Sequence, residues 1–383
     1  MASVGIIAEY NPFHNGHLYH LEKIKEMYKD DTIILVLSGN FTERGDVSII
    51  DKWKKTEIAL KAGIDLVVEL PFPFATQSAD YFSYGAITLL EKLKVEKLVF
   101  GSESDNLEDI KLIAEEQINN PEFEKLVKVY SKLGENYPTA LSKTLYDLTN
   151  KSIKDPNDLL AISYIKTIIE NNYKIKPISI KRTNDYHNSN IESNISSATA
   201  IRKALEEDRN IKETVPKFVI PYLKDLHFID DYFKYLKYKI ITEDDLSIYH
   251  GVDEGLDKLL KKEILNSNNY NELINNIKTK RYTYNKISRM LLHILCNFTK
   301  EKANSFRNID YIRVLGFNDK GKKYLNKIKK QVDVPIISKM TREKSTMLEY
   351  ELETTKIYAL GNNLFSLVEN EYNNKLFKEK VND

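Results

Sequence analysis

Strand and helix signals alternate along the first hundred residues, and this alternation constrains the fold more than any other feature of the chain. Short apolar runs at residues 4–8, 32–37, 65–70 and 97–100 are typical of buried β-strands. Stretches with helical spacing lie between them and are joined by short connections. A βαβαβα order implies right-handed crossovers and a parallel sheet with helices on both faces. We therefore predict an α/β fold with a doubly wound, Rossmann-like parallel sheet.

Capping and turn residues mark the ends of the helices in this region. Residues 17–27 are amphipathic, and Asp51 precedes a helical stretch that ends at Gly63. Aspartate is a favourable N-cap, and glycine tolerates the left-handed conformation that ends many helices. A further helix is predicted within residues 78–93, which supplies the crossover before the fourth strand.

A second group of elements follows the fourth strand. The pattern is helical through residue 169, and a strand then returns at residues 175–181. Pro177 places that strand near a sheet edge or a strand start, because proline cannot donate a ladder hydrogen bond. The Ser196-Ser197 pair then caps a helix that runs to about residue 207.

The length of the chain, 383 residues, exceeds the usual size of one hydrophobic core. We predict a catalytic domain over residues 1–207 and a mainly helical, basic, RNA-binding region over residues 208–383. Within that second region, residues 311–317, 320–330 and 334–338 indicate a small strand-helix-strand pattern.

Cysteine content and hydropathy indicate the cellular compartment in which the protein is expected. Cys296 is the only cysteine and lies in an apolar run, so we expect a buried, inert thiol and neither a disulfide nor a thiolate zinc site. Asn11 and Pro12 interrupt the apolar N-terminal segment, unlike a signal peptide. No apolar run approaches the ~20 residues of a membrane span. We expect a cytoplasmic protein with no membrane partner and no obligate protein partner.

The segment after the first strand carries the residues best suited to chemistry. In an open parallel sheet the ligand crevice lies beyond the carboxyl ends of the strands, where His14-Asn15-Gly16-His17 is expected. His14 and His17 stand three apart at a helix start, beside free backbone N–H groups. A triphosphate would meet a helix dipole and two imidazoles there. A metal site needs at least a third ligand, and no acidic or thiol ligand has helical spacing to the pair, so we expect no protein-held metal ion.

A second helix start has the same character. Ser196, Ser197 and Thr199 present hydroxyl groups, and Arg202 lies one turn inside the helix. Alone, such a string indicates a capped helix. Paired with the histidines, it indicates the second half of a nucleotide site. We take His14, His17, Ser197, Thr199 and Arg202 as the candidate catalytic residues.

These two motifs resemble the HxGH and ISSTxxR signatures of HIGH-superfamily nucleotidylyltransferases. More narrowly, the segment from Gly5 to His17, the Gly101-Ser102-Glu103-Ser104 string, Pro156-Asn157 and the string ending at Arg202 are similar to the tRNA(Met) cytidine acetate ligase family. That resemblance implies that ATP and acetate form acetyl-adenylate. It also implies that the acetyl group passes to N4 of the wobble cytidine in elongator tRNA(Met).

The resemblance also implies an ATP site, whose residues are assigned to the matching positions of this sequence. Its residues are Ile7, Ala8, Glu9, Tyr10, Asn11, Pro12, Phe13, His14, Asn15, Gly16, His17, Gly101, Asn157 and Arg182. Residue chemistry alone leaves three of them open: Gly101 could be a turn glycine, Asn157 a helix cap and Arg182 an exposed arginine. Mg²⁺ is expected as the ion that bridges the phosphates of ATP.

The polar segment after the second strand is a candidate wall for the acyl substrate. Asn40, Arg44 and Lys52 are the candidate contacts to acetate, because a small carboxylate needs one cation or a few N–H donors. An ordinary solvated loop is the alternative.

Charge is segregated along the chain although the net charge is only +1. Residues 278–330 hold fifteen lysines and arginines against three acidic residues. At the start of this block, cationic residues alternate with aromatic ones, a mixture that suits phosphate contacts and base stacking. The candidate tRNA contacts are Lys278, Lys280, Arg281, Tyr282, Lys286 and Arg289. A solvated basic face is the alternative.

Three functions compete on this evidence. The leading hypothesis is an ATP-dependent ligase that adenylates acetate and acetylates a tRNA cytidine. An adenylyltransferase acting on a small phosphorylated metabolite is the second, and the basic block disfavours it. A nucleotide-dependent RNA-binding protein without bond-forming activity is the third, and the histidine pair disfavours it.

Overall fold

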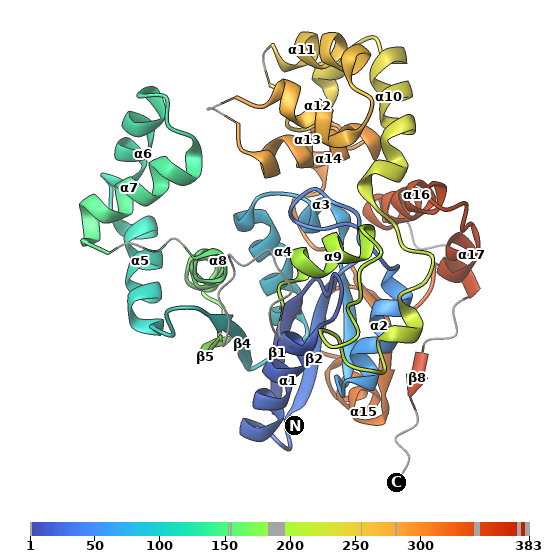
Figure 1. Cartoon of the computed structure of the whole chain (residues 1–383). Helices are drawn as coiled ribbons and strands as arrows, with labels where there is room; N and C mark the ends of the chain where they lie inside the picture. The colour runs from blue at the N-terminus through green and yellow to red at the C-terminus, as the bar shows by residue number, and fades with distance from the viewer. Residues whose placement is uncertain are drawn as a thin grey trace.

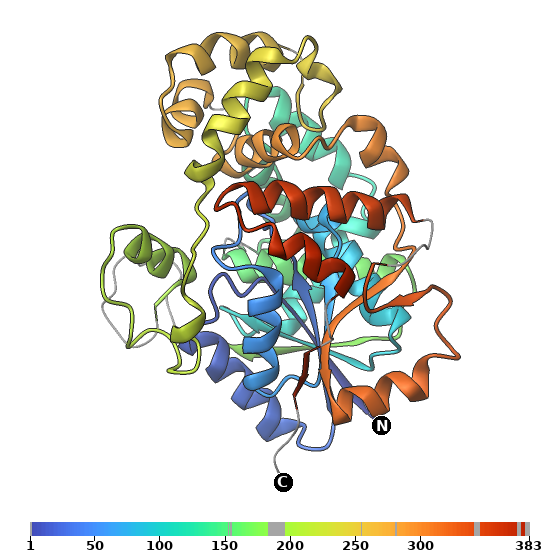
Figure 2. The same ribbon diagram turned by 90° about the vertical axis from the view of Figure 1, so that its right-hand side faces the viewer.

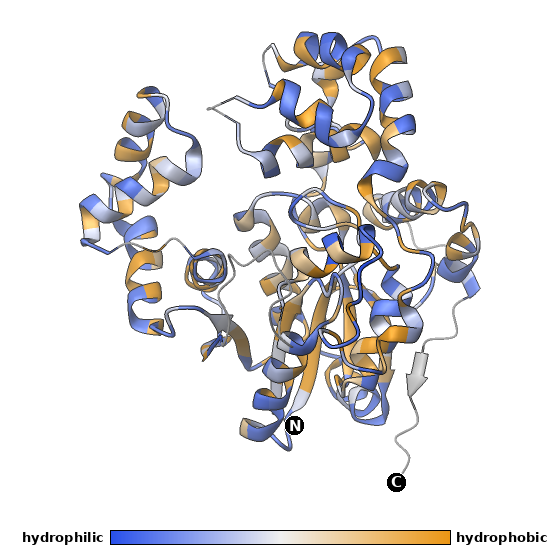
Figure 3. Cartoon of the chain, viewed as in Figure 1, coloured by the Kyte–Doolittle hydropathy of each residue, from blue (hydrophilic) through white to orange (hydrophobic). Residues whose placement is uncertain are grey.

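The computed structural model describes residues 2–151, 153, 155–182, 196–253, 255–279, 282–340 and 345–373, and the backbone of 377–379. Within these ranges one sheet forms the centre of the molecule, with helices packed around it (Figure 1). Hydrophobic residues concentrate in the central strands and on the inner sides of the helices (Figure 3). The core therefore lies between the sheet and the helices that cover it.

The predicted strands up to residue 181 form the parallel part of this sheet. They are β1 (Ser3–Ala8), β2 (Thr32–Ser38), β3 (Leu66–Leu70), β4 (Lys97–Ser102) and β5 (Lys176–Lys181). Their order is β5-β4-β1-β2-β3, and each neighbouring pair is parallel. The prediction of a doubly wound parallel sheet is confirmed, and Pro177 lies on the edge strand where it was expected.

Three later strands extend the sheet. β6 (Ile312–Asn318) pairs with β3 in antiparallel orientation, and β7 (Ile336–Ile337) and β8 (Phe377–Glu379) each pair with β6 in parallel. The predicted strand-helix-strand pattern is therefore present, with α15 (Asp319–Ile328) between β6 and β7. Its strands join the sheet of the first 207 residues, so the sheet draws on both sides of the predicted division at 207.

Helices cover both faces of the sheet (Figure 2). α1 (Asn15–Met27) and α2 (Lys52–Lys61) lie on one face, and α4 (Ala79–Lys92) lies on the other, with α8 (Pro156–Glu170) packed against α4. The capping signals acted as predicted: the Asp51 carboxylate accepts hydrogen bonds from the N–H groups of Trp53 and Lys54 at the start of α2.

Two groups of helices stand beyond the sheet. α5 (Leu107–Asn119), α6 (Phe123–Lys132) and α7 (Tyr137–Thr149) form one flank. The second group, here called the helical lobe, lies above the carboxyl ends of the strands (Figure 1). It comprises α10 (Phe233–Thr242), α11 (Leu256–Glu263), α12 (Tyr270–Ile277), α13 (Tyr284–Leu295) and α14 (Lys300–Ser305).

The last helices return to the sheet region. α16 (Thr346–Leu360) contacts both α17 (Ser366–Asn373) and α3 (Phe72–Ala75). Cys296, at the C-terminus of α13, is fully buried as predicted. Among the described residues, no helix is both long enough and apolar enough to cross a membrane.

The basic block at residues 278–330 does not form one surface, contrary to the expectation from its charge. Its first part belongs to the helical lobe, whereas α15 lies at the opposite end of the sheet (Figure 1). Arg313, on β6, is fully buried and pairs with Glu371. A count of charges along the sequence could not predict this distribution. The chain leaves the helical lobe and returns to the sheet within this block, so its basic residues lie in different parts of the molecule.

Candidate functional site

A cavity of about 350 Å³ opens at the carboxyl ends of β1, β4 and β5. β1 pairs with β2 on one side and β4 on the other, so the chain winds in opposite directions from this point. Such a switch point is where ligands bind in open α/β sheets. Predicted site residues that line the cavity are Ile7, Ala8, Glu9, Tyr10, Asn11, His14, Gly16, His17, Arg44, Gly101, Asn157, Arg182, Ser197, Thr199 and Arg202.

His14 and His17 cap α1 and face the cavity at the same time. The Gly16 N–H donates to His14 Nδ1 at 3.1 Å, and the His14 N–H donates to His17 Nδ1 at 3.3 Å. The two rings stack with centroids 3.7 Å apart. Because Nδ1 accepts a hydrogen bond in both rings, each neutral ring carries its proton on Nε2. The cap therefore fixes which ring nitrogen can donate to a ligand.

Burial keeps these rings neutral. Burial, together with the charges of Arg182 and Arg202, lowers the pKa of His14 to about 3. Burial and the neighbouring His14 lower the pKa of His17 well below its usual value. His20, one turn further along α1, also lines the cavity, and burial lowers its pKa to about 4. His20 belongs to no recognisable motif, so its place in the cavity could not be predicted from sequence.

The second motif reaches the same place from α9 (Ala198–Glu206). The Ser197 hydroxyl accepts from the Ala200 N–H at 3.2 Å, which confirms the predicted cap. Arg202 Nη1 donates to the Asn11 carbonyl at 2.8 Å, and Nη2 donates to the Thr199 hydroxyl at 3.3 Å. Two motifs separated by more than 180 residues therefore meet in one cavity.

The loop after β4 is held by α8. The Asp158 carboxylate is buried and accepts from the N–H groups of Glu103 at 3.1 Å and Ser104 at 3.0 Å. Glu103 in turn accepts from the Asn157 amide and lies 3.7 Å from Arg182 Nε. This network brings Asn157 and Arg182 beside Gly101. Asp158 is a supporting residue that the sequence gave no reason to select.

Gly101 leaves room for the arginine of this network. A Cβ atom at Gly101 would lie 3.1 Å from Arg182 Cγ, so a side chain there would press on that arginine. The close approach of Arg182 to the backbone explains why a glycine is favoured at residue 101, near the end of β4.

Three predicted ATP-site residues do not line the cavity. Phe13 is fully buried in the core, and Pro12 lies in the turn behind it. The Asn15 amide donates to the Glu213 carbonyl at 2.7 Å, and its backbone N–H donates to the Thr214 carbonyl. These contacts shape the turn that carries the histidines.

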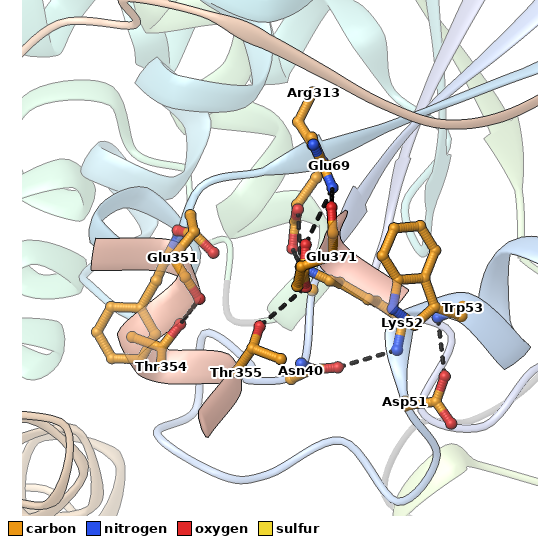
Figure 4. A network of polar contacts seen from close by, with 12 residues as sticks. Asn40, Asp51, Lys52, Trp53, Glu69, Arg313, Glu351, Thr354, Thr355 and Glu371 are labelled. Atoms are coloured by element: carbon orange, nitrogen blue, oxygen red, sulfur yellow. Dashed lines mark hydrogen bonds and ion pairs between the residues drawn. The ribbon is translucent and has the colours of Figure 1, made fainter. Parts of the chain in front are cut away.

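Asn40 and Lys52, predicted as acetate contacts, also do not line the cavity. They belong to the polar network drawn in Figure 4. Lys52 Nζ is 2.8 Å from Glu69 Oε1 and 2.7 Å from Glu371 Oε1, and Asn40 Oδ1 accepts from the Lys52 N–H at 2.9 Å. Lys52 is fully buried. Its partner Glu371 comes from α17, so the local sequence could not reveal this network. The positions of Asn40 and Lys52 do not support contact with acetate.

The loop after β2 forms the wall of the cavity opposite β4. Thr42, Glu43, Arg44 and Asp46 line it, and here this segment is called the β2 loop. Burial raises the pKa of Glu43 above its ordinary value, although the positive charge of Arg289 acts in the opposite direction. Burial also raises the pKa of Asp46. Of these four, only Arg44 was predicted, because the sequence did not show which loop residues turn inward.

The predicted tRNA contacts divide into different environments. Lys278 is exposed and follows α12 directly. Lys286 is half-buried, pairs with Asp253, and its Nζ lies 4.6 Å from the centre of the Tyr282 ring. Arg289 instead pairs with Glu43 at 2.6 Å. Lys280 and Arg281 lie outside the described residues.

Metal ligands were not predicted in the protein. Within the described parts of the chain, no three His, Cys, Asp or Glu residues are grouped so that they could hold a metal ion.

Comparison with known proteins shows likeness along the whole chain. The family model for HIGH Nucleotidyl Transferase matches residues 1–374. A tRNA(Met) cytidine acetate ligase of Clostridium novyi (strain NT) is 39% identical over 94% of this chain and 96% of its own. One of Geobacillus sp. (strain WCH70) is 38% identical over 90% of both chains.

Solved structures show the same extent of similarity. Apo Thermotoga maritima TmcAL has a TM-score of 0.93 at 29% identity, and the same protein bound with alpha-thio ATP has a TM-score of 0.90 at 28% identity. Both cover 100% of this chain and of the other. The likeness in fold therefore extends over both the sheet and the helical lobe.

Proposed function

The chain belongs to the HIGH nucleotidyl transferases and, among them, to the tRNA(Met) cytidine acetate ligase family, and from this premise we propose that it is an ATP-dependent ligase that acetylates N4 of the wobble cytidine in elongator tRNA(Met). The observation that carries the proposal is the cavity at the switch point, where two helix N-termini and two neutral histidines converge. This arrangement suits a nucleotide triphosphate.

The first step is adenylation of the carboxylate. An acetate oxygen attacks the α-phosphorus of ATP, the bond to the β-phosphate oxygen breaks, and pyrophosphate leaves. Negative charge grows on the α-phosphate oxygens, and preorganised donors stabilise that charge. The Nε2–H groups of His14 and His17, with Arg202 and the hydroxyls of Ser197 and Thr199, supply such donors. Gly101, Asn157 and Arg182 hold the nucleotide on the β4 side.

The second step is transfer to the base. N4 of the cytidine attacks the acetyl carbonyl carbon, the bond from that carbon to the phosphate oxygen breaks, and AMP leaves while N4 loses a proton. The protein must therefore bring a polynucleotide to the cavity mouth. The helical lobe stands above that edge of the sheet, with Lys278, Lys286 and Tyr282 as proposed contacts to tRNA (Figure 1).

Mg²⁺ is proposed to enter with ATP. Magnesium usually keeps several waters and binds through one or two carboxylates together with substrate phosphates. This mode of binding does not require a cluster of protein ligands, and the described residues of the cavity form none. The ion would neutralise part of the charge of the leaving pyrophosphate.

The cavity walls disfavour the main alternative. An adenylyltransferase for a small phosphorylated metabolite must hold a second phosphate group near the nucleotide. The β2 loop instead presents Glu43 and Asp46 beside Arg44. Two carboxylates repel a phosphate dianion more strongly than they repel acetate, which carries a single charge.

Isotope exchange tests the first step directly. Labelled pyrophosphate is incubated with the protein, ATP and acetate, and the label that enters ATP is measured with and without acetate. We expect exchange that depends on acetate and needs no tRNA. Exchange that depends on a phosphorylated metabolite instead would establish the alternative function.

A further inference from the structure

The β2 loop is held from outside by the helical lobe. Arg289 Nη1, from α13, donates to Glu43 Oε1 at 2.6 Å and to the Glu43 carbonyl at 3.2 Å. The neighbouring Ser288 hydroxyl donates to the Gly45 carbonyl at 2.8 Å. Gly45 has a φ of +77°, and a Cβ there would collide with the backbone of Arg289. The loop is thus joined to α13 by three hydrogen bonds and by direct backbone contact at Gly45.

The inner side of the same loop faces the reaction space. Thr42, Glu43, Arg44 and Asp46 line the cavity, and the Glu43 N–H donates to Glu9 Oε1 at 2.7 Å. The loop is therefore fixed between the end of β1 and the helical lobe.

Strand order tells which part of the cavity the loop bounds. β4 and β5 lie on one side of β1, and β2 lies on the other. The residues proposed to hold the nucleotide, Gly101, Asn157 and Arg182, follow or adjoin β4 and β5. The β2 loop consequently walls the half of the cavity that remains for the second substrate.

The surroundings of Arg289 differ from those of an RNA contact. Its side chain is 18% exposed and is engaged with two oxygens of Glu43, whereas Lys286 on the same helix is 44% exposed. A phosphate would have to compete with a short ion pair for the Arg289 guanidinium.

We propose that Arg289 is a positioning residue that fixes the β2 loop as the wall for the second substrate, and so links the helical lobe to that half of the cavity. This inference rests on the proposed function in one respect, since it takes acetate and the cytidine as the second substrates. It also reassigns Arg289, which the sequence had suggested as a tRNA contact.

The test compares Arg289→Gln with the intact protein. We expect the KM for acetate in pyrophosphate exchange to rise on the order of tenfold or more, because small displacements of substrate-positioning groups are costly. The KM for ATP, the affinity for tRNA and the salt dependence of that affinity should stay unchanged. Amide hydrogen exchange of residues 42–46 should become faster.

Three further variants sharpen the comparison. Lys302→Gln is the matched control. Lys302 also links the helical lobe to another part of the chain, through an ion pair with Glu353 on α16 at 3.1 Å, but it does not touch the β2 loop. The KM values for ATP and for acetate should therefore stay unchanged in this variant. Arg289→Lys, which keeps a cation near Glu43, should restore part of the acetate affinity. Glu43→Gln combined with Arg289→Gln should be little worse than Arg289→Gln alone, because partners in one contact are not additive.

The outcomes separate the two ideas. A lower salt slope for tRNA binding in Arg289→Gln, with the KM for acetate unchanged, would overturn the inference and make Arg289 a phosphate contact. An equal rise in the KM values for ATP and acetate would reduce its role to general stability. If the intact protein shows no acetate-dependent exchange, the proposed function fails. The hydrogen exchange of residues 42–46 still decides whether Arg289 positions the loop.

Discussion

His14 and His17 combine a structural and a chemical task in one pair of rings. Each uses Nδ1 to satisfy a backbone N–H at the start of α1, which leaves Nε2–H as the donor toward the cavity. The sequence could predict this pair because the motif is local: a strand end, a turn and a helix start lie within fifteen residues. It could not predict the neutral state of the rings, which comes from burial by distant segments.

Replacing His17 by asparagine tests its chemical task. The asparagine oxygen can still accept the capping hydrogen bond, whereas the Nε2–H donor is lost. Loss of one such donor typically costs about 10²- to 10³-fold in kcat. Pyrophosphate exchange should fall by that order while tRNA affinity stays the same, as measured by filter binding. Loss of tRNA binding in this variant would contradict the assigned role.

The pKa of His14 leads to a dependence of stability on pH. In the folded protein this pKa is about 3, below the ordinary value of 6.5, so the unfolded chain binds a proton more readily between these values. Stability is therefore full above pH 6.5 and falls as the pH drops below it, by up to ~1.4 kcal/mol per pH unit for this one group.

Urea denaturation at pH 7, 6 and 5 measures this loss. In His14→Asn, which retains a good N-cap residue, the free energy of unfolding should fall less steeply with decreasing pH. An identical slope in the two proteins would show that His14 is already exposed to protonation in the folded state.

Among the elements, β1, β2 and α1 were accessible from sequence because their periodicity is local and strong. The loop after β4 was different. The string of residues 101–104 was recognised, but its geometry depends on Asp158, which lies more than fifty residues further along the chain on α8. Nothing in the sequence near Asp158 marks it as the support of that loop.

Asp158→Ala should disturb the nucleotide half of the cavity. It removes the acceptor of two partly buried N–H groups and of the buried Ser102 hydroxyl, and a buried donor left without an acceptor costs roughly 1–3 kcal/mol. The KM for ATP should rise severalfold and the free energy of unfolding should fall, whereas the KM for acetate should change little. Steady-state exchange kinetics and urea denaturation measure both effects. An unchanged KM for ATP would mean that the loop keeps its position without Asp158.

At the scale of the whole molecule, contacts between distant segments decide the fold, and local sequence patterns do not predict them. The return of residues 312–318 into the sheet as an antiparallel strand depends on pairing with β3, about 250 residues earlier. The same return brings Arg313, Glu351 and Glu371 together with Lys52 and Glu69 (Figure 4). Lys52 was misread for this reason: its neighbours in sequence are a polar loop, but its partners come from the other end of the chain.

This buried network should make the C-terminal helices essential for stability. Burial lowers the pKa of Lys52, but Glu371 and Glu69 outweigh it and raise that pKa overall, so the lysine is charged. Lys52→Met would leave the buried Glu69 carboxylate without its ion-pair partner and Glu371 with Arg313 alone, at a cost of about 3–5 kcal/mol in the free energy of unfolding. Lys23→Met, which removes the exposed pair with Glu26, should lower the free energy of unfolding far less in the same urea titration, because solvent screens an exposed ion pair. Equal costs would contradict the importance of the network.

The central claim is that one cavity adenylates acetate and passes the acetyl group to a tRNA cytidine. The most direct measurement incubates the protein with ATP, labelled acetate and unmodified elongator tRNA(Met), then digests the tRNA to nucleosides for mass spectrometry. We predict label in N4-acetylcytidine from the wobble position, and none when ATP is omitted. Adenylate formation without labelled cytidine would contradict the account.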